Sequence, residues 1–380
     1  MNGRGGSKIL RFATAVAFLA AVGGCSNWVL GVVQSFGSPN GGKISTFAGN
    51  GTGSFAGDGG AATSAEIDAP QGVAVDSAGN LYIADSGNSV IRKVDIKSGI
   101  IGPAAGNFQL GPGNTSLGDG GLATAAQLNY PYGIAVDSAG NLYIADTFNN
   151  RVREVTALDG KINTVAGDGT AGTSLTQLNY PYAVAFDSAN SNLYIDDYNN
   201  DRILKVHGGI PTLAAGSGSA GFYGDGGPAV SARLNYPWGI AVDSTGNLYI
   251  ADTSNNLVRK VDTSGNINTV AGSPTGYGYS GDGGPATSAL LHFPVGVTVD
   301  KVGNIYIADQ NNNVIRKVDT SGNISTVAGN FHLGAGYGGD GNVATAAMLN
   351  EPWGLAVDSA GNLYIADSHN QRIRKVGPGK

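Results

Sequence analysis

Residues 237–252 read PWGIAVDSTGNLYIAD, and closely similar strings occur six times along the 380 residues of this chain. Each copy begins at a proline: Pro70, Pro131, Pro181, Pro237, Pro294 and Pro352. Successive prolines are 61, 50, 56, 57 and 58 residues apart. A repeat of this length indicates a propeller, a solenoid or an array, because one such unit cannot bury its own apolar faces.

The fourth repeat predicts four short strands, which we call a to d. Strand a covers 239–243, strand b 248–252, strand c 257–261 and strand d 267–272, with Gly, Asn, Asp and Ser in the turns after strands a and c. Four such strands per repeat are typical of a propeller blade. Strand a has the smallest side chains, which suits a crowded centre. Strand c carries Arg259 and Lys260, which we expect at the wetter outer part of the blade.

The order of the strands at the two chain ends predicts a closed ring. The first strand, 44–48, is of type d, and the last, 372–376, is of type c. If these two segments pair, the sixth blade is completed and no open edge remains. The predicted fold is therefore all-β, a six-bladed β-propeller of four-stranded antiparallel blades.

The repeated pattern P-x-G-[IV]-A-V-D-x-x-G-N-L-Y-I-A-D, followed by N-x-R-[IV]-R-K-V, resembles the NHL repeat. With I-x-T-V-A-G and G-D-G-G-P-A-T-x-A-x-L added, the longer unit is similar to the NHL repeats of teneurins and of exported bacterial proteins. The resemblance covers about residues 43–377. It implies a six-bladed propeller but no single activity, because propellers carry unrelated functions.

The N-terminal segment predicts export and lipid anchoring. Arg4, Lys8 and Arg11 precede an apolar run, 12–22, which is too short to span a bilayer and right for a signal peptide. The run ends in VGG before Cys25, which resembles the lipobox of bacterial lipoproteins. A plain secretory signal with an incidental cysteine is the alternative. We expect a signal peptide at 1–24, a lipidated Cys25 with a tether at 25–42, and the propeller at 43–377.

Composition narrows the range of compartments and partners. Cys25 is the only cysteine, so no intramolecular disulfide is possible. Residues 1–24 contain three basic and no acidic residues, so their removal would take the net charge from −6 to −9. An acidic domain of this kind is a poor nucleic-acid binder. The resemblance to lipoproteins implies a protein of the cell envelope, facing the periplasm or the exterior. Because Ser26 rather than aspartate follows the cysteine, it also implies the outer membrane if the cell is Gram-negative.

The residues around the six prolines are the candidate ligand-binding site. Large aromatic residues follow four of the prolines: Tyr132, Tyr182, Trp238 and Trp353. Aromatic residues also precede four of them: Tyr130, Tyr180, Tyr236 and Phe293. At the start of the innermost strand they would lie at the mouth of the central channel and bind a sugar face or a peptide. The alternative is that these rings only pack between blades.

The connections between strand d and the next strand a carry a second repeated motif. Five contain Gly-Asp-Gly, centred on Asp58, Asp119, Asp225, Asp282 and Asp340, while the third connection, 168–179, is short and lacks it. We predict no cofactor; a Ca²⁺ site at these aspartates is one alternative, and capping of the following short segment, such as 285–290, is the other. The short third connection should leave a notch in the rim.

The twelve aspartates that end strands a and b recur in every repeat, which favours a structural role over a catalytic one. The four histidines show no metal-ligand spacing, and Glu351 with His292 is the best acid–base pair. We therefore expect a non-catalytic binding module for a protein, peptide or glycan, touching the membrane only through its lipid anchor. The alternative function is a metal-dependent, lyase- or lactonase-like propeller enzyme.

Overall fold

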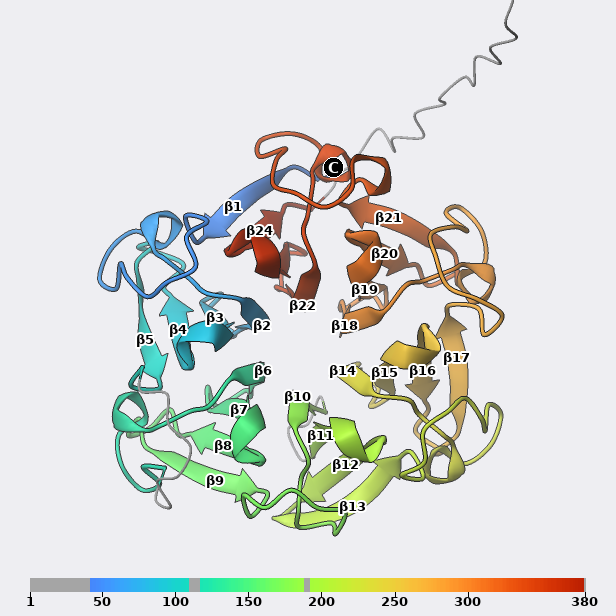
Figure 1. The fold of residues 1–380 in the computed structure, drawn as a ribbon, viewed down its shortest axis with the longest axis horizontal. Coiled ribbons are helices and arrows are strands. Elements are labelled where there is room, and N and C mark those ends of the chain that lie inside the picture. The colour runs from blue at the N-terminus through green and yellow to red at the C-terminus, as the bar shows by residue number, and fades with distance from the viewer. Residues whose placement is uncertain (1–41, 109–116, 188–191, 379–380) are drawn as a thin grey trace, which may run out of the picture. The chain divides into compact units, whose positions relative to one another are not determined.

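The computed structural model describes residues 42–108, 117–187 and 192–378. The predicted signal peptide, Cys25 and nearly all of the tether lie outside these ranges. The described residues form six four-stranded antiparallel sheets arranged as blades around a central channel (Figure 1). They contain no helix long and apolar enough to cross a lipid bilayer.

In each blade the strands run in the order a, b, c, d from the channel to the rim. The strands of blades 1 to 6 are β2 (Pro70–Val75), β3 (Leu81–Asp85), β4 (Val90–Val94) and β5 (Ile101–Ala105); β6 (Pro131–Val136), β7 (Leu142–Asp146), β8 (Arg151–Val155) and β9 (Ile162–Ala166); β10 (Pro181–Phe186), β11 (Leu193–Asp197), β12 (Arg202–His207) and β13 (Ile210–Ala215); β14 (Pro237–Val242), β15 (Leu248–Asp252), β16 (Leu257–Val261) and β17 (Ile267–Ala271); β18 (Pro294–Val299), β19 (Ile305–Asp309), β20 (Val314–Val318) and β21 (Ile324–Ala328); β22 (Pro352–Val357), β23 (Leu363–Asp367), β24 (Arg372–Val376) and β1 (Ile44–Ala48).

The predicted ring closure is confirmed. Strand β1 pairs antiparallel with β24, with Ile44 opposite Val376 and Thr46 opposite Arg374. The N-terminal strand therefore completes the sixth blade, and in Figure 1 it lies on the rim beside β24. The four strands predicted for the fourth repeat agree with β14 to β17 to within two residues at each end.

Short 3₁₀ turns join strand b to strand c in every blade and define one face of the ring, which we call the top face. They are η2 (Ser86–Asn88), η4 (Thr147–Asn149), η5 (Tyr198–Asn200), η7 (Thr253–Asn255), η9 (Gln310–Asn312) and η12 (Ser368–Asn370). Five further turns lie in the connections between blades: η1 (Ala62–Ser64), η3 (Ala123–Ala125), η6 (Ala229–Ser231), η8 (Ala286–Ser288) and η11 (Ala344–Ala346). One more, η10 (Phe331–Leu333), follows β21.

The hydrophobic core lies between neighbouring blades. One cluster, for example, joins Val258 of β16 to Ile307 of β19 and Leu291 of the connection between them, all fully buried. Because each blade buries its faces against its two neighbours, the whole ring must form for any one blade to be covered.

The expectation that strand c is wet and outward-facing is wrong for the arginine at its third position. Arg92, Arg153, Arg259, Arg316 and Arg374 are fully buried. In the fourth blade Nη2 of Arg259 donates to Oδ1 of Asp225 at 2.6 Å, and Oδ2 of Asp225 accepts from the Thr269 hydroxyl, also at 2.6 Å. The aspartate of each Gly-Asp-Gly loop is therefore the ion-pair partner of a buried arginine. The capping alternative is wrong too, since Pro285 precedes η8 without a side-chain cap.

The Gly-Asp-Gly loops also join the outer strands of consecutive blades. Before the fourth blade, Gly216 at the end of β13 donates its N–H to Ala229 O at 3.0 Å. Gly226 of the same loop donates to Ile267 O of β17 at 2.8 Å, and Ile267 N donates to Gly227 O at 3.0 Å. The loop is thus hydrogen-bonded to the rim strands on both of its sides.

The third blade lacks both the aspartate of the loop and the buried arginine at the third position of strand c. Leu204 occupies the position of the buried arginine of strand c. The absence of the loop aspartate therefore leaves no arginine unpaired at this position. Pro211 stands where β17 has Ile267, and proline has no N–H to donate to a loop. The predicted notch is confirmed as a cavity of about 290 Å³ between β9 and blade 3, with Leu175, Leu178 and Val206 in its wall.

Candidate functional site

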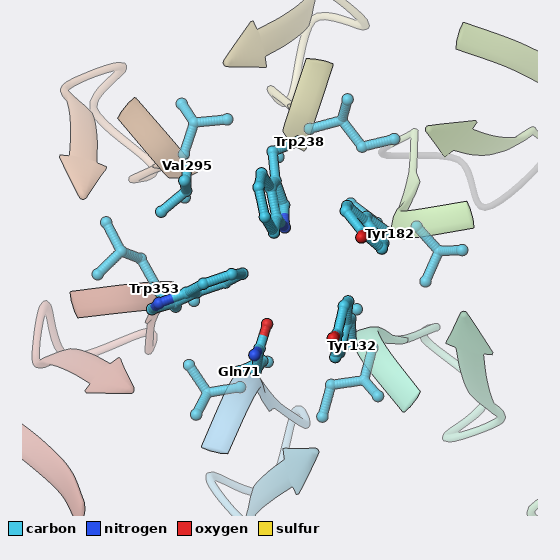
Figure 2. Close-up of a pocket in the computed structure, with 18 residues that line it drawn as sticks. Gln71, Tyr132, Tyr182, Trp238, Val295 and Trp353 are labelled. Atoms are coloured by element: carbon cyan, nitrogen blue, oxygen red, sulfur yellow. The ribbon is translucent and has the colours of Figure 1, made fainter. Parts of the chain in front are cut away.

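The residues that follow the six prolines meet at the mouth of the central channel. Figure 2 shows Gln71, Tyr132, Tyr182, Trp238 and Trp353 directed toward one another, with Val295 completing the circle. They enclose a pocket of about 90 Å³ whose deeper wall is apolar, formed by residues such as Val73, Ile134 and Leu355. The predicted position of Tyr132, Tyr182, Trp238 and Trp353 at the channel mouth thus agrees with the structure.

The four inner rings pack in a closed circuit. Ring centroids lie 4.8 Å apart for Tyr132 and Tyr182 and 4.6 Å for Tyr182 and Trp238. Trp238 meets Trp353 edge to face at 4.5 Å, and Trp353 returns to Tyr132 at 6.3 Å. Such contacts stabilise each ring in place. The rings therefore present a rigid surface. They do pack between blades, as the alternative in the sequence analysis proposed, and this packing is compatible with ligand binding.

The aromatic residues before the prolines extend this surface outward. Tyr130 contacts Phe148, which contacts Tyr180, while Tyr236 contacts Tyr198. We call the connected set the aromatic patch: Tyr130, Tyr132, Phe148, Tyr180, Tyr182, Tyr198, Tyr236, Trp238, Phe293 and Trp353. Tyr130, Phe148 and Tyr236 at its rim are 38%, 40% and 42% exposed, so the patch is open to a ligand from the top face.

Phe148 and Tyr198 are members of the patch that sequence reasoning missed. Both lie in top-face turns, η4 and η5, next to the truncated connection between the second and third blades. Where Tyr198 stands, four other repeats have a serine or threonine and the fifth has Gln310. An aromatic residue that departs from the repeat at a top-face turn was the signal available in the sequence.

Strained backbone positions hold the rim rings. The residue before each proline has a positive φ, for example 46° at Tyr130, 55° at Tyr180 and 49° at Tyr236. This conformation is unfavourable for bulky residues. It is held from the preceding blade, since the N–H of Tyr180 donates to Asn150 Oδ1 at 2.9 Å and that of Tyr236 to Asp201 Oδ1 at 2.8 Å. Neighbouring blades therefore fix the orientation of the patch together.

The pocket is polar at few points and uncharged. None of its lining residues is acidic or basic. Burial raises the pKa of Tyr132 to about 12, so this phenol remains a neutral donor at physiological pH. Two buried polar atoms lack a hydrogen-bond partner among the described residues, Oε1 of Gln71 and Nε1 of Trp353.

The recurring aspartates are structural, as predicted. At the end of strand b, Asp252 accepts the N–H of Asn235 at 2.8 Å and the amide of Asn255 at 2.9 Å, and burial raises its pKa to about 7. At the end of strand a, Asp243 accepts the N–H groups of Thr245 and Asn247, both at 2.9 Å. Burial raises the pKa of Asp243, but its hydrogen bonds together outweigh this effect and lower it to about 2.

The candidate metal and acid–base residues have other partners. Asp58, Asp119, Asp225, Asp282 and Asp340 each bind an arginine, so a Ca²⁺ ion would have to displace a guanidinium group. Among the described residues no group of three His, Cys, Asp or Glu side chains suits a metal ion. Glu351 lies 3.4 Å from His369 Nδ1, while His292 contacts Asn311 and stacks on Tyr277, so the structure does not make them a pair.

Comparisons with known proteins agree with this geometry. A profile of the teneurin NHL domain matches residues 51–113, 104–176, 173–280 and 272–336, and an NHL-repeat profile matches 349–376. The chain is 31% identical to SUPPRESSOR OF QUENCHING 1 of Arabidopsis thaliana over 70% of its length, and 30% identical to mouse teneurin-4, also over 70%. It spans only 26% and 8% of these two relatives.

Solved structures share the fold at low sequence identity. An auxiliary nutrient binding protein from Bacteroides thetaiotaomicron superposes with a TM-score of 0.64 at 17% identity, covering 89% of this chain and 76% of that one. A gluconolactonase from Xanthomonas campestris superposes with a TM-score of 0.53 at 14% identity, covering 83% and 87%. Proteins that bind and proteins that catalyse are thus both found on this architecture.

Proposed function

This chain belongs to the teneurin-type NHL-repeat family, and from that premise we propose that it is a non-catalytic binding module. Its aromatic patch would recognise a protein, peptide or glycan on the top face. The long loops and paired arginines of the rim would serve to keep the ring rigid, so that binding requires little reorganisation.

The observation that carries this proposal is the continuity of the aromatic patch. Rings from five blades are in contact with one another. Three of them, Tyr130, Phe148 and Tyr236 at the rim, are about two-fifths exposed to solvent instead of being buried in the core. Exposed connected aromatic surface on a monomer is typical of interaction sites. Flat rings of Trp and Tyr supply large contact areas to sugars and peptides.

The direct test is a triple substitution of the rim, Tyr130→Ser, Phe148→Ser and Tyr236→Ser. We expect binders found on a glycan array and a peptide array to lose at least tenfold in affinity, because their stacking surface is removed. The melting temperature should change little, since the exposed parts of these rings contribute little to the core. Binding is measured by calorimetry and folding by circular dichroism.

Tyr223→Ala is the matched control, because Tyr223 is 66% exposed but belongs to a rim loop outside the patch. It should leave the affinity unchanged. Full affinity in the triple variant, or the failure of both arrays to give a binder, would overturn the proposal. A divalent ion that binds one per chain and is required for folding or ligand binding would favour the alternative, a metal-dependent propeller enzyme.

We also propose that the module is tethered to the cell envelope through a lipid on Cys25. The proposal is supported by the sequence before that residue, which resembles a lipobox. Cys25→Ser should release the protein from membranes into the soluble fraction and block processing at residue 24. Fractionation with an immunoblot measures both effects. Unchanged membrane partitioning of the variant would count against lipidation.

A further inference from the structure

One buried side chain has no explanation in the fold. At the fourth position of strand b, five blades carry an alanine, Ala84, Ala145, Ala251, Ala308 and Ala366, whereas the third carries Asp196. Asp196 is fully buried, and neither of its carboxylate oxygens has a hydrogen-bond partner among the described residues. Burying an unpartnered carboxyl group costs stability, and alanine at this position would avoid that cost.

The repeat places Asp196 directly behind the wall of the pocket. In the fifth blade, Ala308 lies opposite Gly296, and a Cβ on that glycine would come within 2.1 Å of the carbonyl oxygen of Trp353 in the next blade. The same relation holds in the first blade between Gly72 and Tyr132. In the third blade Ala183 stands at the position of this glycine and lines the pocket, so by the same relation Asp196 lies behind Ala183, near the start of β14 where Trp238 lines the pocket. The pKa of Tyr182 is raised mainly by its burial, next by the neighbouring tyrosines Tyr132 and Tyr198, and then by the charge of Asp196.

The pocket carries no cationic side chain, and its buried polar atoms without a hydrogen-bond partner among the described residues are one acceptor, Oε1 of Gln71, and one donor, Nε1 of Trp353. Oε1 of Gln71 is unpartnered, and Figure 2 shows its amide directed toward the centre of the channel. The faces of aromatic rings carry the negative part of the ring quadrupole, which attracts cations. Trp238 and Tyr182 stack on each other at 4.6 Å, so one face of each of these two rings is already covered. No lysine or arginine lines the pocket, while the carboxylates of Glu351 and Asp201 lie in the segments next to it.

We propose that the group entering the channel mouth is an organic cation, an ammonium or guanidinium group, and that Asp196 is a specificity-determining residue which favours it through the pocket wall. This inference rests on the proposed function, because it uses the same aromatic patch. The shared chemistry has two sources, a lysine or arginine side chain of a polypeptide and a free polyamine.

Binding of such a cation would change the protonation of Asp196. Burial raises the pKa of this carboxyl well above its usual range, and the nearby charges of Asp197 and Asp201 act in the same direction. Asp197 is paired with Arg202 at 2.7 Å, and Asp201 accepts the N–H of Tyr236. A cation on the other side of the wall favours the ionised form of Asp196, so a proton is released on binding.

The experiment compares a short lysine peptide with the same peptide carrying norleucine, and uses spermidine as the free polyamine. Calorimetry on the full chain should show at least a tenfold preference for lysine over norleucine. Titration in two buffers of different ionisation enthalpy measures the released proton. If spermidine binds and the lysine peptide does not, the source of the cation is a free polyamine. If only the lysine peptide binds, the source is a side chain of a polypeptide.

Asp196→Ala is the decisive variant because alanine is the residue of the other five blades. We expect its melting temperature to rise, its lysine preference to fall to about threefold or less, and proton release to disappear. Asp196→Asn should lose the preference in the same way without becoming more stable. Asp159→Asn, in the turn between β8 and β9, removes the same charge from a 45% exposed side chain and should leave both the lysine preference and the proton release unchanged.

Two results would overturn the inference: equal affinity for the lysine and norleucine peptides together with no binding of spermidine, or a more stable Asp196→Ala protein that keeps the full preference for the cationic ligand. The proposed function fails separately. If neutral glycans bind and the rim triple variant abolishes that binding, the patch is a binding site without cation specificity. If the triple variant keeps its affinity for every ligand, the patch itself is excluded.

Discussion

At the scale of single residues, Asp243, Asp252 and Asp196 have the same side chain in three different environments. Asp243 ends strand a in a hydrogen-bonded turn, which lowers its pKa to about 2, although burial alone would raise it. Asp252 ends strand b in the interior, and burial raises its pKa to about 7 despite its partners. Asp196 is buried, and neither of its carboxylate oxygens has a hydrogen-bond partner among the described residues. The position in the blade, rather than the residue type, therefore decides which aspartates stabilise the fold.

The pH dependence of stability, compared between the wild type and Asp196→Ala, should isolate the contribution of Asp196. Its pKa is raised in the folded state, so from about pH 4 upward the folded protein holds a proton that the unfolded chain has lost. The wild-type free energy of unfolding should then fall, relative to Asp196→Ala, by up to about 1.4 kcal/mol per pH unit. Urea unfolding at pH 4, 5, 6 and 7 measures the difference between the two proteins.

That difference should grow with pH across this window. Asp243 has the opposite sign, because its lowered pKa gives stability that is lost only as the pH falls toward 2, and both proteins share it. A difference that is constant from pH 4 to 7 would show that Asp196 is already ionised in the folded state at pH 4.

At the scale of elements, the Gly-Asp-Gly loop and strand c form one unit. The buried arginine of strand c has its closest carboxylate in the loop, as Arg259 has in Asp225 at 2.6 Å, whereas Asp252 is 3.5 Å away. In the third blade the loop, its aspartate and the arginine are all missing together. This pattern is expected if a buried charge without its partner is more costly than the loss of the whole pair.

A double-mutant comparison tests this unit. Asp225→Ala should lower the free energy of unfolding by about 3 kcal/mol, because Arg259 stays buried without its closest partner. Adding Arg259→Leu, the residue found as Leu204 in the third blade, should restore at least about 1 kcal/mol of that loss. Urea denaturation of the wild type, both single variants and the double variant gives the coupling energy.

Additive effects of the two substitutions would contradict the paired role. Leu158→Ala is a suitable control, because Leu158 is 97% exposed in a turn of the second blade and should leave the free energy of unfolding unchanged.

At the scale of the whole molecule, closure of the ring is the central stabilising feature. Strand β1 comes from one end of the chain and β24 from the other, and together they complete the sixth blade. Because the core lies between blades rather than within them, opening one blade exposes the apolar faces of its neighbours as well. The channel mouth depends on the same closure, since its lining residues come from all six blades.

Deletion of residues 43–49 should therefore destabilise the entire ring, not only the sixth blade. We expect a melting temperature lower by 10 °C or more, or an insoluble product, because the edge of β24 becomes unpaired. Thermal unfolding followed by circular dichroism measures this. Deletion of residues 26–36 from the predicted tether is the control and should leave the melting temperature unchanged; an unchanged value for the first deletion would contradict the closure argument.

The repeat in the sequence was enough to predict the blades, their number and the closure of the ring. Turn residues and β-branched strand residues recur at the same positions in each copy, so the strands predicted in one copy are predicted in the others as well. It also placed Trp238 and Trp353 at the channel mouth. It could not predict that the strand c arginines are buried, since their aspartate partners lie 34 residues earlier in the chain and no local pattern joins them.

Sequence alone thus determined the architecture of this protein, for the physical reason that strands, turns and repeats are local properties of the chain. Tertiary structure decided what surrounds each side chain. Only the closed ring brings Phe148 and Tyr198 into the aromatic patch, and only it shows that Asp196 is buried without a partner behind the pocket wall. Burial and charge pairing depend on residues that are distant in sequence, and these quantities decide where a ligand can bind.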